Sequence, residues 1–267
     1  MTTFKRRILR LLPERAKNIL RPVYRSIFRK STYQGSPDMS SGLGIESFSG
    51  YRIAYRIGTS DEAVIADSFE NDILFAAVPE YKPHVNDVII DIGAHIGTFT
   101  LLASSKVPSG TVYAIEACAD SCNLVHINKA LNCAANISVH HLAITDKRGT
   151  CTLFYDTGNW GHSVVAPLSS QVEIVRTCTL SDFFRDNDIN LCNFMKLNCE
   201  GAEFPILLCT PAVDLRKVHM MLILYHCDLW KHNTEQDLIA HLQGCGFNTL
   251  LRNKVGQRGW IIATIVK

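Results

Sequence analysis

The sequence predicts an α/β fold in which a doubly wound, mostly parallel sheet of seven strands carries helices on both faces. Apolar, strand-like stretches alternate with helical patterns from residue 88 to the end of the chain. This alternation is typical of βαβ units, whose crossover helices make the sheet parallel. A glycine-containing turn at residues 93–97 directly follows the first of these strands. Doubly wound folds receive a nucleotide ligand at such a turn.

The expected elements follow one another in a regular order. We expect strands at Val88–Ile92, Thr111–Glu116, Ile137–Ile144, Phe194–Asn198, Met220–His226, Thr249–Arg252 and Trp260–Val266. We expect helices between them at Thr98–Lys106, Asp120–Leu131, Ser181–Asp186, Ala202–Cys209 and Glu235–Gly244. Two further β-rich stretches, Cys151–Asp156 and Val172–Thr177, predict a hairpin-like insertion over one edge of the sheet.

Composition and charge exclude several classes of protein. Hydrophobic residues make up 47% of the 267, which excludes a disordered chain and is enough for one sizeable core. The net charge of +2 averages two unlike regions, because residues 1–30 carry ten basic side chains and one acidic one. The rest of the chain has a formal charge of −7. An acidic body excludes a uniformly basic nucleic-acid-binding protein, so nucleic acid is not an expected partner.

The chain is expected to divide into a basic amphipathic helical arm at 1–30, a Ser- and Gly-rich linker at 31–50, and one α/β domain at 51–267. Two interpretations of the arm stay open. It lies in a membrane interface with its cations near anionic headgroups, or it packs on the body with a solvated basic face. An Arg-rich, acid-poor start also fits an organelle transit peptide. The ten cysteines form no CxxC pair, which favours reduced thiols and a cytoplasmic protein, with the cytoplasmic membrane face as the target of the arm.

The glycine turn indicates the kind of cofactor. Gly93 and Gly97 lie four residues apart, and the middle glycine that would admit a pyrophosphate is missing, which argues against NAD or FAD. Asp91, just before them, suits a cofactor with a cationic group. Glu116 ends the next strand, where a carboxylate can accept both hydroxyls of a ribose. In this order the residues resemble a class I S-adenosylmethionine-dependent methyltransferase. The alternative is a structural turn with a surface Glu116.

Four motifs make the resemblance more specific. The segment 196–203, KLNCEGAE, is similar to the KIDVEGAE-type motif of the FkbM methyltransferase family. Residues 56–61, RIGTSD, resemble an R-x-GTSD element that precedes the sheet in many members. Residues 91–97, DIGAHIG, and 179–184, TLSDFF, complete the set in the family's order. The match covers about residues 52–266, so the arm lies outside it, and residues 51–267 would form the methyltransferase domain.

This resemblance implies methyl transfer from S-adenosyl-L-methionine to a hydroxyl oxygen, commonly on a glycan or a secondary metabolite, so the expected partner is a small-molecule or glycan acceptor. The residues implied in cofactor binding are Asp91, Gly93, Ala94, His95, Gly97, Glu116, Ala117 and Ala143. The residues implied at the acceptor are His226, Glu200 and Asn198.

Asn198 stands where the family has an acid. An amide cannot act as a base or bind a divalent cation strongly, so we expect no metal site.

A sugar hydroxyl needs a base that removes its proton during attack. We favour His226 over Glu200, because the ordinary pKa of histidine, roughly 6.5, is close to operating pH. The alternatives are a hydrogen-bonded histidine at a strand end and, for Glu200, a carboxylate stabilised at a helix N-terminus. Lys196 is expected to form a structural ion pair, with Glu200 or Glu203 as its partner.

Two other functions stay open. One is an RNA methyltransferase that uses residues 1–30 as an electrostatic arm, which the acidic body disfavours. The other is a catalytically degenerate methyltransferase fold that serves as a scaffold at a membrane. This alternative stays open because Asn198 and Leu224 both depart from the family's pattern. The loop at residues 159–163, within the β-rich insertion, is polar and contains glycine. It can form a hairpin turn or cover the acceptor.

Overall fold

The structure of the protein is a computed structural model that describes residues 42–69, 73–76, 78–156 and 161–266. The basic segment 1–30 lies outside these residues, as does the first part of the segment 31–50.

In the described part of the chain, seven strands form the central sheet. They are β3 (Val88–Ile92), β4 (Thr111–Glu116), β5 (Ile137–His141), β9 (Cys192–Leu197), β10 (Val218–His226), β11 (Phe247–Val255) and β12 (Arg258–Ile265), in the spatial order β11-β12-β10-β9-β3-β4-β5. The pairs from β5 to β10 are all parallel, and β12 is antiparallel to both β10 and β11. The predicted doubly wound, mostly parallel sheet is therefore confirmed.

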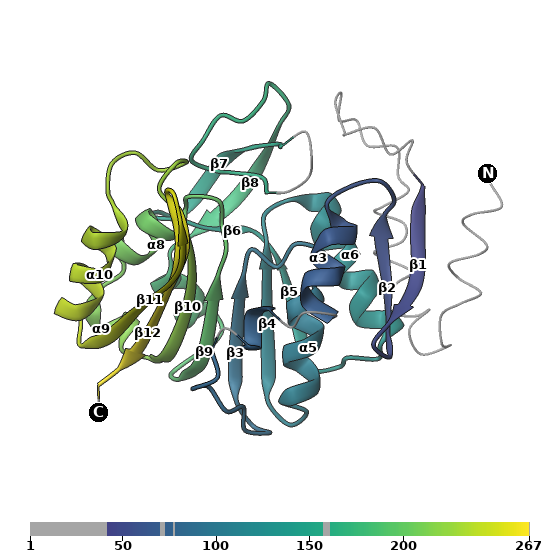
Figure 1. Ribbon diagram of the computed structural model, residues 1–267, viewed down its shortest axis with the longest axis horizontal. Helices are drawn as coiled ribbons and strands as arrows, with labels where there is room; N and C mark the ends of the chain where they lie inside the picture. Colours follow the sequence, from purple (N-terminus) through teal and green to yellow (C-terminus); the bar gives the residue numbers. More distant parts are fainter. Residues whose placement is uncertain (1–41, 70–72, 77, 157–160, 267) are drawn as a thin grey trace.

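The strand order reverses between β3 and β9. The chain winds from β3 outward through β4 and β5, then returns to β9 on the other side of β3. A crevice opens at such a switch point, outside the carboxyl ends of the two strands. This topology places the loop after β3 opposite the loop after β9 (Figure 1).

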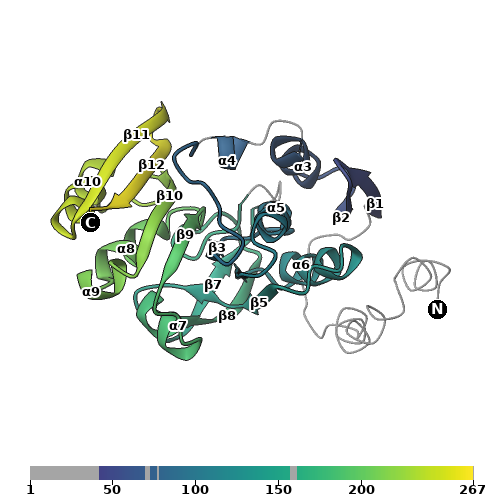
Figure 2. The same ribbon diagram turned by 90° about the horizontal axis from the view of Figure 1, so that it is seen from below.

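Two layers of helices cover the sheet. Along β3, Ile89 packs into one hydrophobic core and Ile90 into the other, as a period of two requires. The first core lies beneath α3 (Asp61–Phe69), α4 (Ile73–Ala76), α5 (Thr98–Lys106) and α6 (Ala119–Leu131). The second lies beneath α7 (Leu180–Asp186), α8 (Glu203–Cys209), α9 (Ala212–Leu215) and α10 (Glu235–Gly244). Figure 2 shows the two layers on opposite sides of the sheet.

Capping residues explain where two of the helices begin. Thr179 and Thr234 each accept a hydrogen bond from the backbone N–H three residues later, and the side chain of the aspartate there accepts the backbone N–H of the threonine. Such reciprocal capping satisfies two of the N–H groups that a helix start leaves without partners.

The insertion between β5 and α7 forms a second sheet. The strands β6 (Ala143–Ile144), β8 (Val172–Cys178) and β7 (Gly149–Phe154) lie in that order, and β7 pairs with β8 antiparallel. Figure 1 shows this sheet above the carboxyl ends of the central strands. The predicted single strand Ile137–Ile144 is wrong at this point, since it divides into β5 and β6. Pairing with β4 ends at His141, and after Leu142 the chain pairs with β8 instead.

An N-terminal hairpin corrects the expected linker. Residues 43–48 form β1 (Leu43–Phe48), which pairs antiparallel with β2 (Tyr51–Arg56). Ser49 and Gly50, both at positive φ, form the two-residue turn between them. The side chain of Asn128 on α6 accepts the N–H of Ala54 at 2.6 Å and donates to its carbonyl at 3.1 Å. The hairpin is thus part of the folded domain, because α6 supplies partners that its own sequence does not reveal.

Candidate active site

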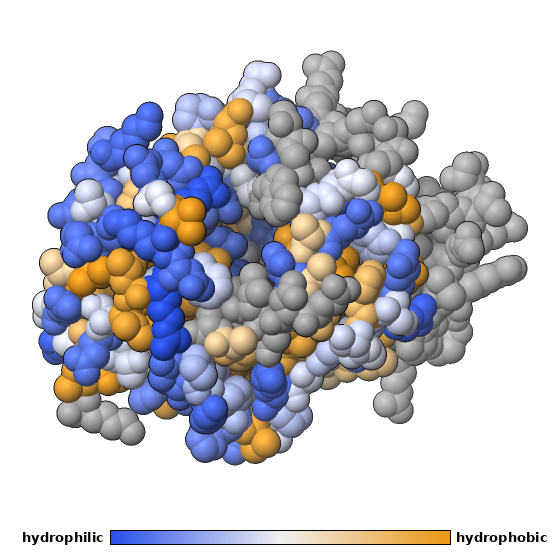
Figure 3. Space-filling model, in the orientation of Figure 1, coloured by the Kyte–Doolittle hydropathy of each residue, from blue (hydrophilic) through white to orange (hydrophobic). Residues whose placement is uncertain are grey.

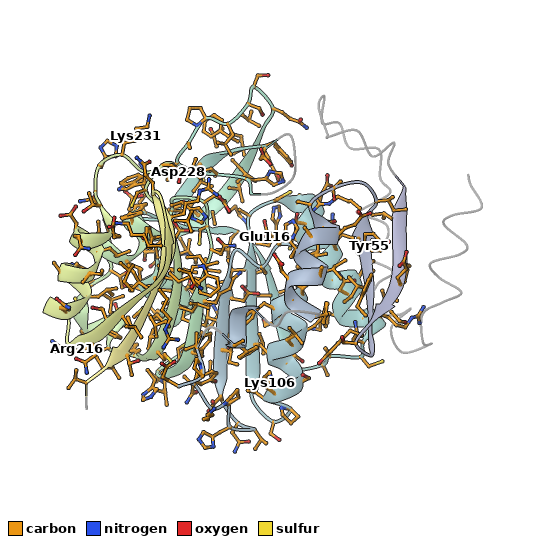
Figure 4. The ribbon with its side chains drawn as sticks, viewed as in Figure 1. Tyr55, Lys106, Glu116, Arg216, Asp228 and Lys231 are labelled. Atoms are coloured by element: carbon orange, nitrogen blue, oxygen red, sulfur yellow. The ribbon has the colours of Figure 1, made fainter. Side chains whose placement is uncertain are left out.

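A cavity of about 430 Å³ opens at the switch point of the sheet, a volume typical of small-molecule sites. The loops after β3, β4, β9 and β10 line it, together with α3 and the insertion. Figure 3 shows this face of the molecule hollowed near its centre. Figure 4 places Glu116 and Asp228 at this end of the sheet, whereas Lys106 and Arg216 lie at the opposite end.

The glycine turn forms the floor of the cavity through its backbone. Gly93 has φ +80°, and a Cβ atom there would lie 1.9 Å from the carbonyl oxygen of Asn198. The loops after β3 and β9 can therefore cross only if residue 93 lacks a side chain. Gly97 has φ +85°, and a Cβ atom there would lie 3.2 Å from the side chain of Val125 on α6. Gly93, Ala94 and His95 line the cavity, whereas Gly97 shapes the start of α5 without reaching it.

Asp91 lies beneath the cavity and does not line it. Its carboxylate is fully buried, with Lys196 Nζ at 2.9 Å from one oxygen and the Thr100 hydroxyl donating to the other at 2.6 Å. Lys196 also donates to the carbonyl of Gly93 at 2.8 Å. The ion pair expected for Lys196 thus exists with a different partner, Asp91, because β3 and β9 pair with these two residues in register. The pair supports the glycine turn from below.

Glu116, at the end of β4, faces the cavity with an acceptor group. Its carboxylate accepts the N–H of His95 at 2.7 Å and the N–H of Cys118 at 2.8 Å. Burial raises the pKa of Glu116, and these two backbone hydrogen bonds oppose that rise. A carboxylate has about four lone-pair sites, so it keeps acceptor capacity toward two ligand hydroxyls. Ala117 and Ala143 line the cavity beside it.

A buried ion pair between Arg56 and Asp61 supports His95 on the wall of the cavity. Arg56, at the end of β2, binds Asp61 through two nitrogens at 2.8 and 2.9 Å. The same guanidinium reaches Ser121 at 3.2 Å and lies 3.3 Å from Nε2 of His95. The R-x-GTSD element thus fixes His95 and, through its N–H, the carboxylate of Glu116. The motif was visible in the sequence, but this contact depends on how β2 packs against the glycine turn.

His226, at the end of β10, lies between two carboxylates. Its Nδ1 lies 3.2 Å from Glu203, whose other hydrogen bonds come from the N–H groups of Cys199 and Gly201. Its Nε2 lies 3.5 Å from Glu200. Burial lowers the pKa of His226, but the hydrogen bond to Glu203 and the charges of both glutamates outweigh burial and raise it. With Glu203 at Nδ1, the ring can exchange a proton at Nε2, where Glu200 is beyond the usual hydrogen-bond distance.

Glu200 is enclosed by the insertion. It has φ +50°, and Ser163 donates to its carbonyl oxygen at 2.7 Å. A Cβ atom on Gly161 would lie 2.3 Å from the Glu200 carboxyl carbon, so a side chain there would displace the Glu200 carboxylate. Burial raises the pKa of Glu200, and His226 opposes that rise. The sequence places His226 and Glu200 after neighbouring strands, and the structure brings both to one end of the cavity.

Arg258 and Asp228 lie at the same end of the cavity, and the sequence did not indicate either of them. Arg258 binds Asp228 at 2.8 Å and lies 4.0 Å from Glu200. It begins β12, which is antiparallel to β10, so its register beside His226 depends on a pairing that no local pattern reveals.

Two buried polar atoms on the cavity wall indicate that the site takes a ligand. Among the described residues, neither Oδ1 of Asn198 nor Nε2 of His162 has a hydrogen-bond partner. Leaving such a group unpaired costs about 1–3 kcal/mol, which a bound ligand can offset. Together with the Glu116 carboxylate, these atoms fit a ligand that carries hydroxyls and further polar groups. Within the described ranges, no three His, Cys, Asp or Glu side chains are grouped so as to hold a metal ion.

Comparison with known proteins identifies the family. A doubly wound sheet with an acid after its second strand and a cavity at its switch point defines an α/β enzyme that binds a nucleoside cofactor. A family model described as the methyltransferase FkbM domain matches residues 91–249, more than half of the chain. The protein belongs to the FkbM methyltransferase family. The resemblance drawn from the four motifs is confirmed, and S-adenosylmethionine is the cofactor that this membership calls for.

Several solved structures are similar to this chain. The methyltransferase FkbM from Methylobacillus flagellatus KT is 15% identical, with a TM-score of 0.49, over 77% of this chain and 53% of that one. The precorrin-6y C5,15-methyltransferase from Geobacter metallireducens GS-15 is 13% identical, with a TM-score of 0.46, over 73% of this chain and 88% of that one. Among curated proteins, none matches this sequence.

Proposed function

We propose that the protein transfers a methyl group from S-adenosylmethionine to a hydroxyl oxygen of a small-molecule or glycan acceptor, with His226 as the general base. The observation that carries the proposal is the position of His226 on the cavity wall, with Glu203 at Nδ1 and Glu200 at Nε2. An unassisted hydroxyl is a weak nucleophile, so its methylation needs a base in this position.

When bound, the cofactor would supply an electrophilic methyl group on a sulfonium, so that an oxygen–carbon bond would form as a sulfur–carbon bond breaks. The residues of the chain align the reactants and manage the proton. The acceptor hydroxyl gives its proton to Nε2 of His226, while the Nδ1–H of His226 donates to Glu203. The imidazolium that results is stabilised by the Glu203 carboxylate and, on its other side, by Glu200.

Asn198 orients the acceptor. Its unpaired Oδ1 accepts a hydrogen bond but is not basic, so the proton must leave through a different group. The reacting hydroxyl donates to His226 at the end of β10, and another polar hydrogen of the acceptor donates to Asn198 after β9. Glu116, at the end of β4, would hold the ribose of the cofactor on the other side of the cavity.

The test separates cofactor binding from turnover in the full-length protein. The wild type, His226→Asn and the remote control His84→Asn are incubated with S-adenosylmethionine and a pool of saccharides and glycolipids. Products that have gained one methyl group are measured by mass spectrometry, and cofactor affinity by calorimetry. We expect His226→Asn to lose about 10²–10⁴-fold in rate with unchanged cofactor affinity, as loss of a general base does.

The control His84→Asn should behave as wild type, because His84 is exposed and lies at the opposite end of the sheet. A wild type that does not bind the cofactor would contradict the proposal. So would a wild type that binds it but methylates nothing in the pool, which is the behaviour of a scaffold. A His226→Asn variant as fast as wild type would remove His226 from its role.

We further propose that residues 1–30 attach the enzyme to an anionic membrane surface, on the cytoplasmic face. The support is the segment's charge of +9 and the helical spacing of its apolar residues. Among the described helices, none is long and apolar enough to cross a membrane.

Co-sedimentation with vesicles tests this attachment. Replacing Arg6, Arg7 and Arg10 by Gln should weaken binding to phosphatidylserine-containing vesicles by about a hundredfold, since each cation near the surface contributes about 1 kcal/mol. The wild type should not bind neutral phosphatidylcholine vesicles. Equal binding by the two forms, or a wild type that stays in solution, would contradict the attachment.

A further inference from the structure

His162 lies in the insertion, on the wall of the cavity, and has no role in the mechanism above. Its Nδ1 accepts the backbone N–H of Asp156 at 3.0 Å, and its ring packs against Tyr155 with 4.6 Å between ring centroids. Because the backbone N–H is a donor, Nδ1 must be the acceptor, so in the neutral ring Nε2 carries the hydrogen. That N–H is buried and has no partner among the described residues.

The ring is neutral under ordinary conditions. Burial, followed by the nearby positive charge of Arg56, lowers the pKa of His162 to about 4. Near pH 7 the side chain is therefore a fixed N–H donor without charge. A donor of this kind suits a hydroxyl oxygen, which keeps its lone pairs free after giving its own hydrogen to a carboxylate.

The neighbours of His162 indicate which part of a ligand it meets. The residues on either side of it, Gly161 and Ser163, both contact Glu200. Ser163 pairs with Phe154 as an isolated β-bridge, and successive side chains of an extended segment point to opposite sides. The His162 ring thus points away from Glu200.

The charged groups near the ring are Arg56, Asp156, Glu173 and Asp61. Glu173 accepts the N–H of Ala119, in the segment that follows Glu116. Arg56 and Asp61 lie beside the glycine turn. These residues hold His95, whose N–H binds Glu116. His162 is therefore on the Glu116 side of the cavity.

We infer that His162 Nε2–H donates a hydrogen bond to a ribose hydroxyl oxygen of the bound cofactor, and that Glu116 accepts the hydrogen of a ribose hydroxyl from below. The inference rests on the proposed function, since it takes the ligand to be an adenosyl cofactor. The insertion, which contacts Glu200, would then also form part of the cofactor site. The ribose is then held between the end of β4 and the segment that follows β7.

The test combines a change in the protein with a change in the ligand. His162→Asn keeps a side-chain oxygen where Nδ1 accepts the Asp156 N–H but removes Nε2. His162→Gln restores an N–H donor near the Nε2 position. Calorimetry with the full-length protein measures the affinity for S-adenosylhomocysteine and for its 2′-deoxy and 3′-deoxy analogues. His84→Asn serves as the matched control, and thermal unfolding checks that each variant is folded.

We expect His162→Asn to weaken S-adenosylhomocysteine binding by about three- to tenfold, as expected for one hydrogen bond, and His162→Gln to recover part of that loss. For one of the two deoxy analogues the substitution should have no effect, because the partner hydroxyl is already missing. A loss of equal size for all three ligands would overturn the inference, as would no loss for any. A wild type that binds none of the ligands would overturn the proposed function together with it.

Discussion

At Gly93 the backbone after β3 passes so close to the loop after β9 that no side chain fits. Gly93→Ala should destabilise the protein by at least about 2 kcal/mol, because the new Cβ would meet the carbonyl of Asn198 and the left-handed conformation disfavours alanine. Gly256→Ala is the matched control, with φ +60° and no atom within 4 Å of the added Cβ. It should lose about 1 kcal/mol from the conformation alone.

Chemical denaturation of both variants measures the difference. The extra loss at Gly93 reports the clash, which Gly256→Ala does not have. Equal losses in the two variants would show that the close approach of the two loops contributes nothing to stability.

Other single residues show where local patterns stop being informative. The positions of Glu116 and His226 beside the cavity could be predicted, because each residue ends an apolar strand and the carboxyl ends of parallel strands meet at one edge of the sheet. Asp91 was expected at the cofactor, but a residue within a strand can point beneath the turn as easily as into the cavity. Its partner Lys196 is 105 positions away, and only the register of β3 with β9 brings the two together.

At the scale of elements, prediction succeeded where the signals lie in the local sequence, such as an apolar strand, a glycine turn or a capping threonine. The strands β3 and β4 and the helices α5 and α10 have the predicted bounds. It failed where pairing is decided by a distant segment. The residues 137–144 have one continuous strand-like pattern, yet β5 pairs with β4 and β6 with β8. The residues 43–48 resemble a linker in composition, but β2 and α6 supply their partners.

The candidate site could be predicted in outline for the same reason. The ends of strands were expected to meet, and the motifs indicated which ends carry chemistry. The sequence left open whether the loop at residues 159–163 covers the acceptor, because its position depends on how the three-stranded insertion sheet packs. The close approach of Gly161 to Glu200 and the orientation of His162 are both consequences of that packing.

At the scale of the whole molecule, the cavity divides into two sides. In the proposed function, Glu116 and His95 line the cofactor side, and His226 and Glu200 line the acceptor side. The pair of Arg56 with Asp61 supports the first side, and Glu203 supports the second. The loops after β3 and β9 lie between them at the switch point of the sheet. The net charge of −7 outside the arm agrees with a cationic cofactor and an uncharged acceptor. The positive charge of the arm lies outside the family match.

In the proposed mechanism, His226 is the base, and Glu203 raises its pKa. Histidine NMR titration of the full-length wild type and of Glu203→Gln measures this directly, and His226→Asn assigns the resonance among the ten histidines. Because the Glu203 carboxylate raises the pKa of His226, the wild-type value should lie above the ordinary 6.5 and should fall in Glu203→Gln. The methyl-transfer rate should rise with pH through the same value, since a base must be neutral to accept a proton. A wild-type pKa below 6.5, or one that Glu203→Gln leaves unchanged, would contradict the account.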